Sequence, residues 1–176
     1  MMDAWVTWPG PPGPMGFKVL SLEGPGVRSA LAAFTWEGSL VRMAHCSRCG
    51  AAAPSPACMC GLHASYSAGQ VLDQYCQYRD RFLIVAEGQG QVILHEHGWR
   101  AEYCAVHAIV ELYAGNVVKH MQLLRAARYL GNPPLVTLES AIDVVQEHRR
   151  SYPQDGDWQG SWRTDPGARA AAGPPG

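Results

Sequence analysis

Charged side chains are scarce in this 176-residue chain. Asp, Glu, Lys and Arg make up 16% of it, whereas roughly 25% is typical of soluble domains. The net charge of −1 argues against a broadly basic nucleic-acid binder and against an acidic disordered tail. The chain has no apolar run of the roughly 18 residues that a membrane-spanning helix needs. The composition therefore predicts a globular protein with no membrane partner.

Targeting and catalytic motifs are also missing. Residues 1–16 contain neither a basic segment nor an apolar run of signal-peptide length, so we expect a cytoplasmic protein. In that compartment the six cysteines are expected to be metal ligands or free thiols rather than disulfides. The sequence has no P-loop, no G-x-S-x-G, no H-E-x-x-H and no zinc-deaminase signature, so it predicts none of the enzyme classes that these motifs mark.

Glycine and proline gather near the ends of the chain and divide it into three parts. Residues 1–16 form a Trp-, Pro- and Gly-rich segment and residues 151–176 a Gly-, Pro- and Ala-rich one, and we expect both to be flexible tails. Residues 17–150 are expected to form one zinc-stabilised α+β domain, because the length suits a single core.

Hydrophobic periodicity predicts the elements of this domain. We expect strands at 17–22, 40–43 and 82–86, a helix at 67–78 and a hairpin of 91–96 with 99–106. Asn116 and Thr137 are expected N-caps of helices over 117–130 and 138–148. Val117, Leu124 and Ala127 have the spacing of one buried face, with Leu123 and Leu130 beside it. The fold class is predicted as α+β: a small antiparallel sheet or barrel, a zinc knuckle and two C-terminal helices.

Four cysteines within 15 residues are the strongest chemical signal. Cys46 and Cys49 have the two-residue gap of a zinc knuckle, and Gly61 permits the tighter backbone that Cys58 and Cys60 require. Four soft thiolates favour Zn²⁺ in a closed tetrahedral site, which leaves no position for a catalytic water. His45 or His63 is the alternative to one of the thiolates. Cys76 and Cys104 lack nearby partners and are expected to be buried.

Three segments resemble those of one group of proteins. They are Cys58-Met59-Cys60-Gly61-Leu62-His63-Ala64, the strand at 90–96, and Gly98-Trp99-Arg100-Ala101-Glu102-Tyr103-Cys104. Together they resemble the CxCGIYA … GWRAEYA pattern of small uncharacterised zinc-knuckle proteins of actinobacteria and their phages. The resemblance covers about residues 17–135 and implies a cytoplasmic zinc-knuckle protein. It implies no activity.

The hairpin carries two further candidate sites. His95 and His97 project to one side of a strand, and with Glu102 and Arg100 they form a candidate enzyme site, for which His107 or Glu102 is a possible third metal ligand. Separately, alternation places Trp99, Ala101 and Tyr103 on one face of the second strand and Arg100, Glu102 and Cys104 on the other. Trp99, Arg100, Glu102 and Tyr103 are therefore possible ligand-binding residues, through aromatic stacking or contact with an anionic group.

The sequence therefore predicts a non-enzymatic, zinc-stabilised binding module that recognises a nucleic acid or a protein partner. Two alternatives remain open. One is an enzyme centred on His95, His97, Glu102 and Arg100, and the other is a zinc-thiolate redox sensor.

Overall fold

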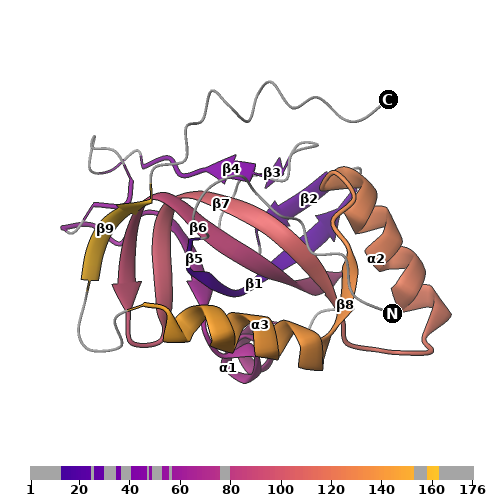
Figure 1. The fold of residues 1–176 in the computed structure, drawn as a ribbon. Helices are drawn as coiled ribbons and strands as arrows, with labels where there is room; N and C mark the ends of the chain where they lie inside the picture. The colour runs from indigo at the N-terminus through magenta and orange to yellow at the C-terminus, as the bar shows by residue number, and fades with distance from the viewer. Residues whose placement is uncertain are drawn as a thin grey trace, which may run out of the picture.

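The structure is a computed structural model that describes residues 13–24, 26–29, 35–36, 41–46, 48, 53–55, 57–75, 80–152 and 158–162. Within these ranges it has an α+β fold, as the sequence predicts, with a curved sheet and three helices (Figure 1). The strands are β1 (Met15–Glu23), β2 (Gly26–Ser29), β3 (Thr35–Trp36), β4 (Val41–Met43), β5 (Leu62–Ser65), β6 (Arg81–His95), β7 (Gly98–Glu111), β8 (Leu135–Thr137) and β9 (Trp158–Trp162). The helices are α1 (Ala68–Tyr75), α2 (Val117–Tyr129) and α3 (Leu138–Arg150).

Strands β1, β5, β6 and β7 pair in a closed circuit, as in a small barrel. Strand β1 pairs with β6 and, at Phe17, with β5; β5 and β6 in turn both pair with β7. All these pairings are antiparallel, but β8 runs parallel to β7. The expectation of a purely antiparallel sheet is therefore wrong at β8, because α2 returns the chain beside β7 in the same direction.

The predicted helices and the hairpin occur where the sequence patterns lie. Asn116 accepts from the Lys119 backbone N–H at the start of α2, and Thr137 accepts from the Ser140 N–H at the start of α3. The strands predicted at 82–86 and 91–96 are one continuous strand, β6. Only Ala68–Tyr75 of the helix predicted at 67–78 is helical, and residues 76–79, which include Cys76, lie outside the described residues.

Both expected tails contain strand residues. Strand β1 begins at Met15, inside the expected N-terminal tail, and Gly88 N donates to Pro14 O at 2.9 Å. In the C-terminal segment, β9 pairs with residues 90–94 of β6. The expectation of irregular structure is therefore wrong at these residues, because main-chain pairing with β6 orders segments that lack a periodic pattern of their own.

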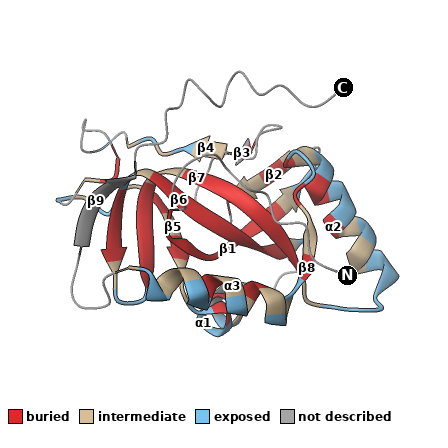
Figure 2. Cartoon of the chain, viewed as in Figure 1, coloured by how far each residue is buried: buried red, intermediate tan, exposed pale blue. Residues whose placement is uncertain are grey.

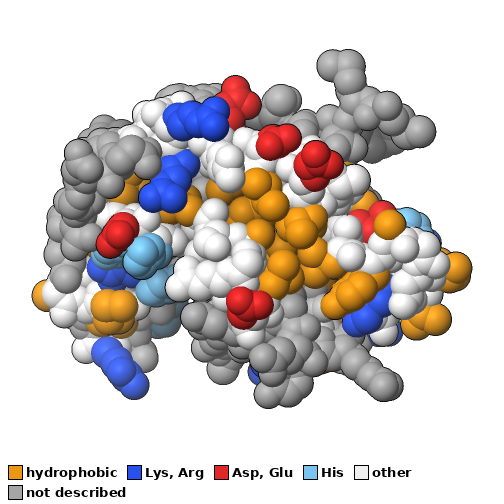
Figure 3. Space-filling view, turned by 90° about the horizontal axis from the view of Figure 1, so that it is seen from below, with side chains coloured by type: hydrophobic (Ala, Val, Ile, Leu, Met, Phe, Trp, Pro, Cys, Tyr) orange, Lys and Arg blue, Asp and Glu red, His pale blue; other side chains and the backbone are white. Residues whose placement is uncertain are grey.

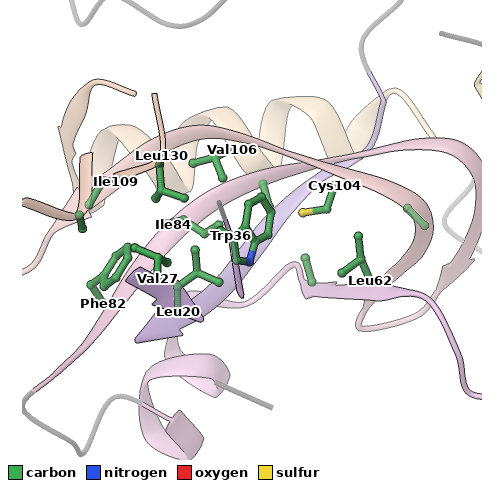
Figure 4. Packing of buried hydrophobic residues seen from close by; sticks show 14 of the residues in the cluster. Leu20, Val27, Trp36, Leu62, Phe82, Ile84, Cys104, Val106, Ile109 and Leu130 are labelled. Atoms are coloured by element: carbon green, nitrogen blue, oxygen red, sulfur yellow. The ribbon is translucent and has the colours of Figure 1, made fainter. Parts of the chain in front are cut away.

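Two hydrophobic clusters stabilise the sheet, and most of the long strands are buried (Figure 2). One cluster includes Trp36, Cys104 and Leu130, which Figure 4 labels. Trp99 of β7 and Leu123, Ala126 and Ala127 of α2 belong to the same cluster. The other lies under α1 and α3, which contribute Val71 and Val145. Burial of Cys104, at 0% exposed, confirms the expectation for this cysteine. The sequence placed Trp99 and Cys104 on opposite faces of β7, but both lie in the same hydrophobic cluster. This prediction is wrong because the pairing of β6 with β7 shifts register between Gln89 and Val92, which breaks the regular alternation.

Candidate metal centre and its supporting contacts

Three of the four predicted ligands lie together. The Sγ atoms of Cys46, Cys58 and Cys60 are all within 4.8 Å of one another, and those of Cys46 and Cys58 are 3.8 Å apart. All three side chains are half-buried. Cys49, the fourth predicted ligand, lies outside the described residues. Three thiols at this separation form a donor group suited to a soft metal ion such as Zn²⁺.

One edge of β7 brings the two cysteine segments together. Strand β4 pairs with β7 up to Met43 opposite Tyr103, and Ala44 N donates to Glu102 O at 2.6 Å. Strand β5 begins on the same strand with Leu62 opposite Ala101. The end of β4 and the start of β5 therefore meet within two or three residues of each other along β7. Because Cys46 follows β4 and Cys60 precedes β5, the sheet pairing itself places the thiols near each other.

The backbone around Cys60 is a tight turn. Ser55 N donates to Cys60 Sγ at 3.3 Å, and Cys58 N donates to Ser55 O at 3.1 Å. Gly61 has φ +117°, a conformation that other residues rarely adopt. This is the backbone freedom that the sequence predicts at Gly61.

We expect Gly61→Ala to destabilise the protein by about 1–3 kcal/mol, since the new Cβ combines backbone strain with crowding. It would lie 3.0 Å from Pro54 Cβ and 3.3 Å from Arg100 Cβ. Chemical denaturation measures the change. Gly26→Ala is the matched control, because its Cβ would have 4.0 Å of room. Equal stability of the two variants would contradict a strained turn at Gly61.

A buried arginine holds the Cys58–Cys60 turn. Arg100 is 4% exposed, and its Nη1 donates to the carbonyl oxygens of Cys58 and Cys60, the latter at 3.2 Å. Its Nε donates to His95 Nε2 at 2.9 Å, so that ring nitrogen of His95 is the acceptor. Arg100 therefore couples the cysteine turn to the β6–β7 hairpin, and it is not free to bind an external ligand.

Replacing Arg100 by methionine is expected to lower zinc affinity by about 10- to 100-fold, as is typical when a contact that orients metal ligands is lost. Competition with a zinc-binding dye measures the affinity. Arg150→Met at the exposed end of α3 is the control and should change it little. An unchanged affinity in Arg100→Met would show that the carbonyl contacts do not orient the ligands.

Neither histidine proposed as a substitute ligand joins the cysteine group among the described residues. The His63 ring instead hydrogen-bonds to Met59 O at 3.0 Å. Burial lowers the pKa of His63, and the charges of Lys18 and Arg100 lower it further. Lys18 donates to His63 O at 3.0 Å, and burial lowers the pKa of this lysine too. His63 therefore anchors the turn, which leaves Cys49 as the predicted fourth ligand.

The structure does not form the predicted ligand-binding surface of the hairpin. Trp99 is 1% exposed and belongs to the hydrophobic cluster. Arg100 is engaged with the cysteine turn, and Glu102 accepts from Gln91 N at 3.2 Å. Of the four predicted residues, Tyr103 and Glu102 are half-exposed. Trp99 is therefore wrong as a stacking residue, because its side chain is buried in the core. For Glu102 and Tyr103 a role in ligand binding stays a prediction.

The candidate enzyme site is not assembled either. His95 accepts from Arg100, whereas the His97 side chain is 74% exposed and lies 3.7 Å from Glu96. His107, the possible third ligand, instead bonds to Glu87 Oε2 at 2.6 Å. In the part of the chain that the structure describes, the cysteines are the only His, Cys, Asp and Glu group with metal-binding geometry.

Sequence reasoning missed a buried polar cluster around Glu87. This carboxylate, 2% exposed, accepts from Gly13 N at 2.6 Å and Gln89 Nε2 at 2.8 Å, and it bonds to the His107 ring. Burial alone raises the pKa of Glu87, but the hydrogen bond and charge of His107, with the other donors, lower it overall. His107 is the extra residue where the β6–β7 register shifts, and such a bulge redirects a side chain. No periodic pattern in the sequence marks this position.

Comparisons with known proteins name no relative. No protein-family model, curated protein or solved structure matches this chain. The resemblance to the CxCGIYA … GWRAEYA proteins therefore stays a prediction. None of the helices in the described ranges is long and apolar enough to cross a membrane.

Proposed function

We propose that the protein is a non-enzymatic binding module whose fold is stabilised by one structural Zn²⁺, held by Cys46, Cys58, Cys60 and Cys49. The convergence of three thiols within 4.8 Å carries the proposal. Arg100 and His95 would hold the cysteine turn in place, and binding the ion would contribute free energy directly to folding. Reduced thiols of this kind suit a reducing compartment such as the cytoplasm.

The arrangement favours a structural rather than a catalytic metal. A fourth thiolate closes the coordination sphere, and catalytic zinc sites keep one position for water or substrate. The hydrogen bonds around the turn run to backbone carbonyls and sulfur, so the neighbouring polar groups are already engaged. A protein partner is favoured over a nucleic acid, because Trp99 and Arg100 are buried and cannot stack on bases or contact phosphates.

Substitution with Co²⁺ tests this coordination. We expect the intense visible absorption of a tetrahedral site and a strong thiolate-to-metal charge-transfer band, with no change on adding azide or cyanide, since no position is open. Cys49→Ser should weaken the charge-transfer band. A six-coordinate spectrum, or one that shifts with azide, would contradict a closed four-thiolate site.

A zinc-thiolate redox sensor is the second candidate, favoured by the 3.8 Å between Cys46 Sγ and Cys58 Sγ. With hydrogen peroxide as the oxidant, the two zinc-bound thiolates would form one disulfide, the peroxide would take up two protons from water and be reduced to two molecules of water, and the metal would be released. Zinc release by peroxide that thioredoxin reverses would support it. Release that reduction cannot reverse would leave only the structural role.

A further inference from the structure

The outward face of α2 carries an apolar surface. Val117, Val118, Met121 and Leu124 are 74%, 70%, 60% and 37% exposed. Val117 and Leu124 were expected in the core, and this expectation is wrong for these two residues. The buried side of α2 consists of Leu123 and Ala127, as expected, together with Ala126. Four exposed apolar side chains on one helix face are characteristic of an interaction surface.

The charges on this helix have one sign. Residues 117–129 include no Asp or Glu, and Arg125 and Arg128 are exposed. At about 100° per residue they project to the same side as Met121. Arg125 also donates to Gly24 O at 2.6 Å, whereas Arg128 makes no hydrogen bond or ion pair with another described residue. A partner for this face therefore needs apolar side chains and negative charge.

Helix α3 offers that combination on the same chain. Glu139, Asp143 and Glu147 are spaced four residues apart and all are exposed, so they form an acidic stripe along the helix. Half-buried Ile142 and Val144 flank the stripe. Figure 3, which views the molecule from the side of α1 and α3, shows acidic side chains along the margin of a hydrophobic area.

We propose that copies of this chain associate by packing the outward face of α2 on one copy against the acidic stripe of α3 on another. Opposite charges favour this contact and disfavour pairing of α2 with α2. Around a twofold axis the same contact forms twice. The apolar side chains of α2 then lie against Ile142 and Val144 instead of water. The inference goes beyond zinc binding and does not depend on it.

Charge reversal tests the contact in the full, zinc-loaded chain. We expect sedimentation velocity to show concentration-dependent association of the natural sequence. Arg125→Glu/Arg128→Glu makes both faces acidic and Asp143→Arg/Glu147→Arg makes both basic. Each variant alone should lose association by at least about tenfold, because like charges then face each other. An equimolar mixture should associate again, since each contact between the two different variants joins opposite charges.

Three further variants separate association from folding. Arg128→Glu alone leaves the Arg125 contact with Gly24 intact and should still weaken association, as should Met121→Ser. Lys119→Glu reverses a charge nearly opposite Met121 on α2 and should leave association unchanged. The proposal is overturned if the natural chain is monomeric at every concentration. A monomeric chain that binds anionic phosphatidylglycerol vesicles would also overturn it, because the face of α2 would then bind lipid rather than a second copy. It is also overturned if the mixed variants stay monomeric.

Discussion

Cys60→Ser is expected to abolish stoichiometric zinc binding and to lower the thermal unfolding midpoint by roughly 10 °C. The Cys60 sulfur is within 4.8 Å of the Cys46 and Cys58 sulfurs, and a serine hydroxyl is a poor substitute for a thiolate. Loss of a structural metal is among the changes that cost more than about 4 kcal/mol. In a chain of this size each kcal/mol corresponds to roughly 2–4 °C.

Cys104→Ala is the matched control for this substitution. Cys104 is fully buried, and burial raises its pKa to about 12, so its sulfur stays protonated in the core. We expect the control to lose some packing energy but to keep its zinc. Elemental analysis of both variants decides the matter. Equimolar zinc in Cys60→Ser, or loss of zinc from Cys104→Ala, would contradict the assignment of the ligands.

Glu87→Gln is expected to destabilise the protein by about 1–3 kcal/mol, the usual cost of leaving a buried hydrogen-bond donor without an acceptor. The carboxylate accepts from Gly13, Gln89 and His107. A glutamine has only one oxygen, so its amide N–H₂ would face a donor. Denaturant unfolding measures the loss, and Glu96→Gln, at an 81% exposed side chain, is expected to change stability by less than about 0.5 kcal/mol.

The same carboxylate gives a pH dependence of defined sign. Because the pKa of Glu87 is lowered from 4.5 in the folded protein, its ionisation stabilises the fold above the unfolded-state pKa. That contribution is lost as the pH falls below about 4.5 and through the folded pKa. The natural chain should therefore lose more stability in this window than Glu87→Gln. Parallel curves for the two proteins would show that the Glu87 pair is not the cause.

Local signals in the sequence predicted local structure well. The caps Asn116 and Thr137 act on backbone N–H groups three residues away, so their effect is visible in sequence. The spacing of Cys58, Cys60 and Gly61 similarly predicted the turn that the structure contains. In each case the interacting groups are near neighbours along the chain.

Long-range pairing explains what the sequence did not predict. The sequence placed Leu123 and Ala127 at the buried side of α2, but Val117 and Leu124 face outward and Ala126 is buried. Which side of a helix is buried depends on the elements that it packs against. Arg100 was expected to contact a ligand, but it binds the carbonyl oxygens of Cys58 and Cys60. These residues are 40 or more positions away in the sequence, so the residues around Arg100 give no sign of this contact. The His107 bulge likewise exists only as a mismatch between two strands.

Metal analysis of the purified full chain tests the central claim most directly. Native mass spectrometry, combined with elemental analysis by inductively coupled plasma, should find one zinc ion per chain without any added metal. A strong chelator should remove this ion, and the protein should then unfold cooperatively. A folded chain that contains no stoichiometric zinc, and that unfolds at the same temperature with and without zinc, would contradict a metal-stabilised fold.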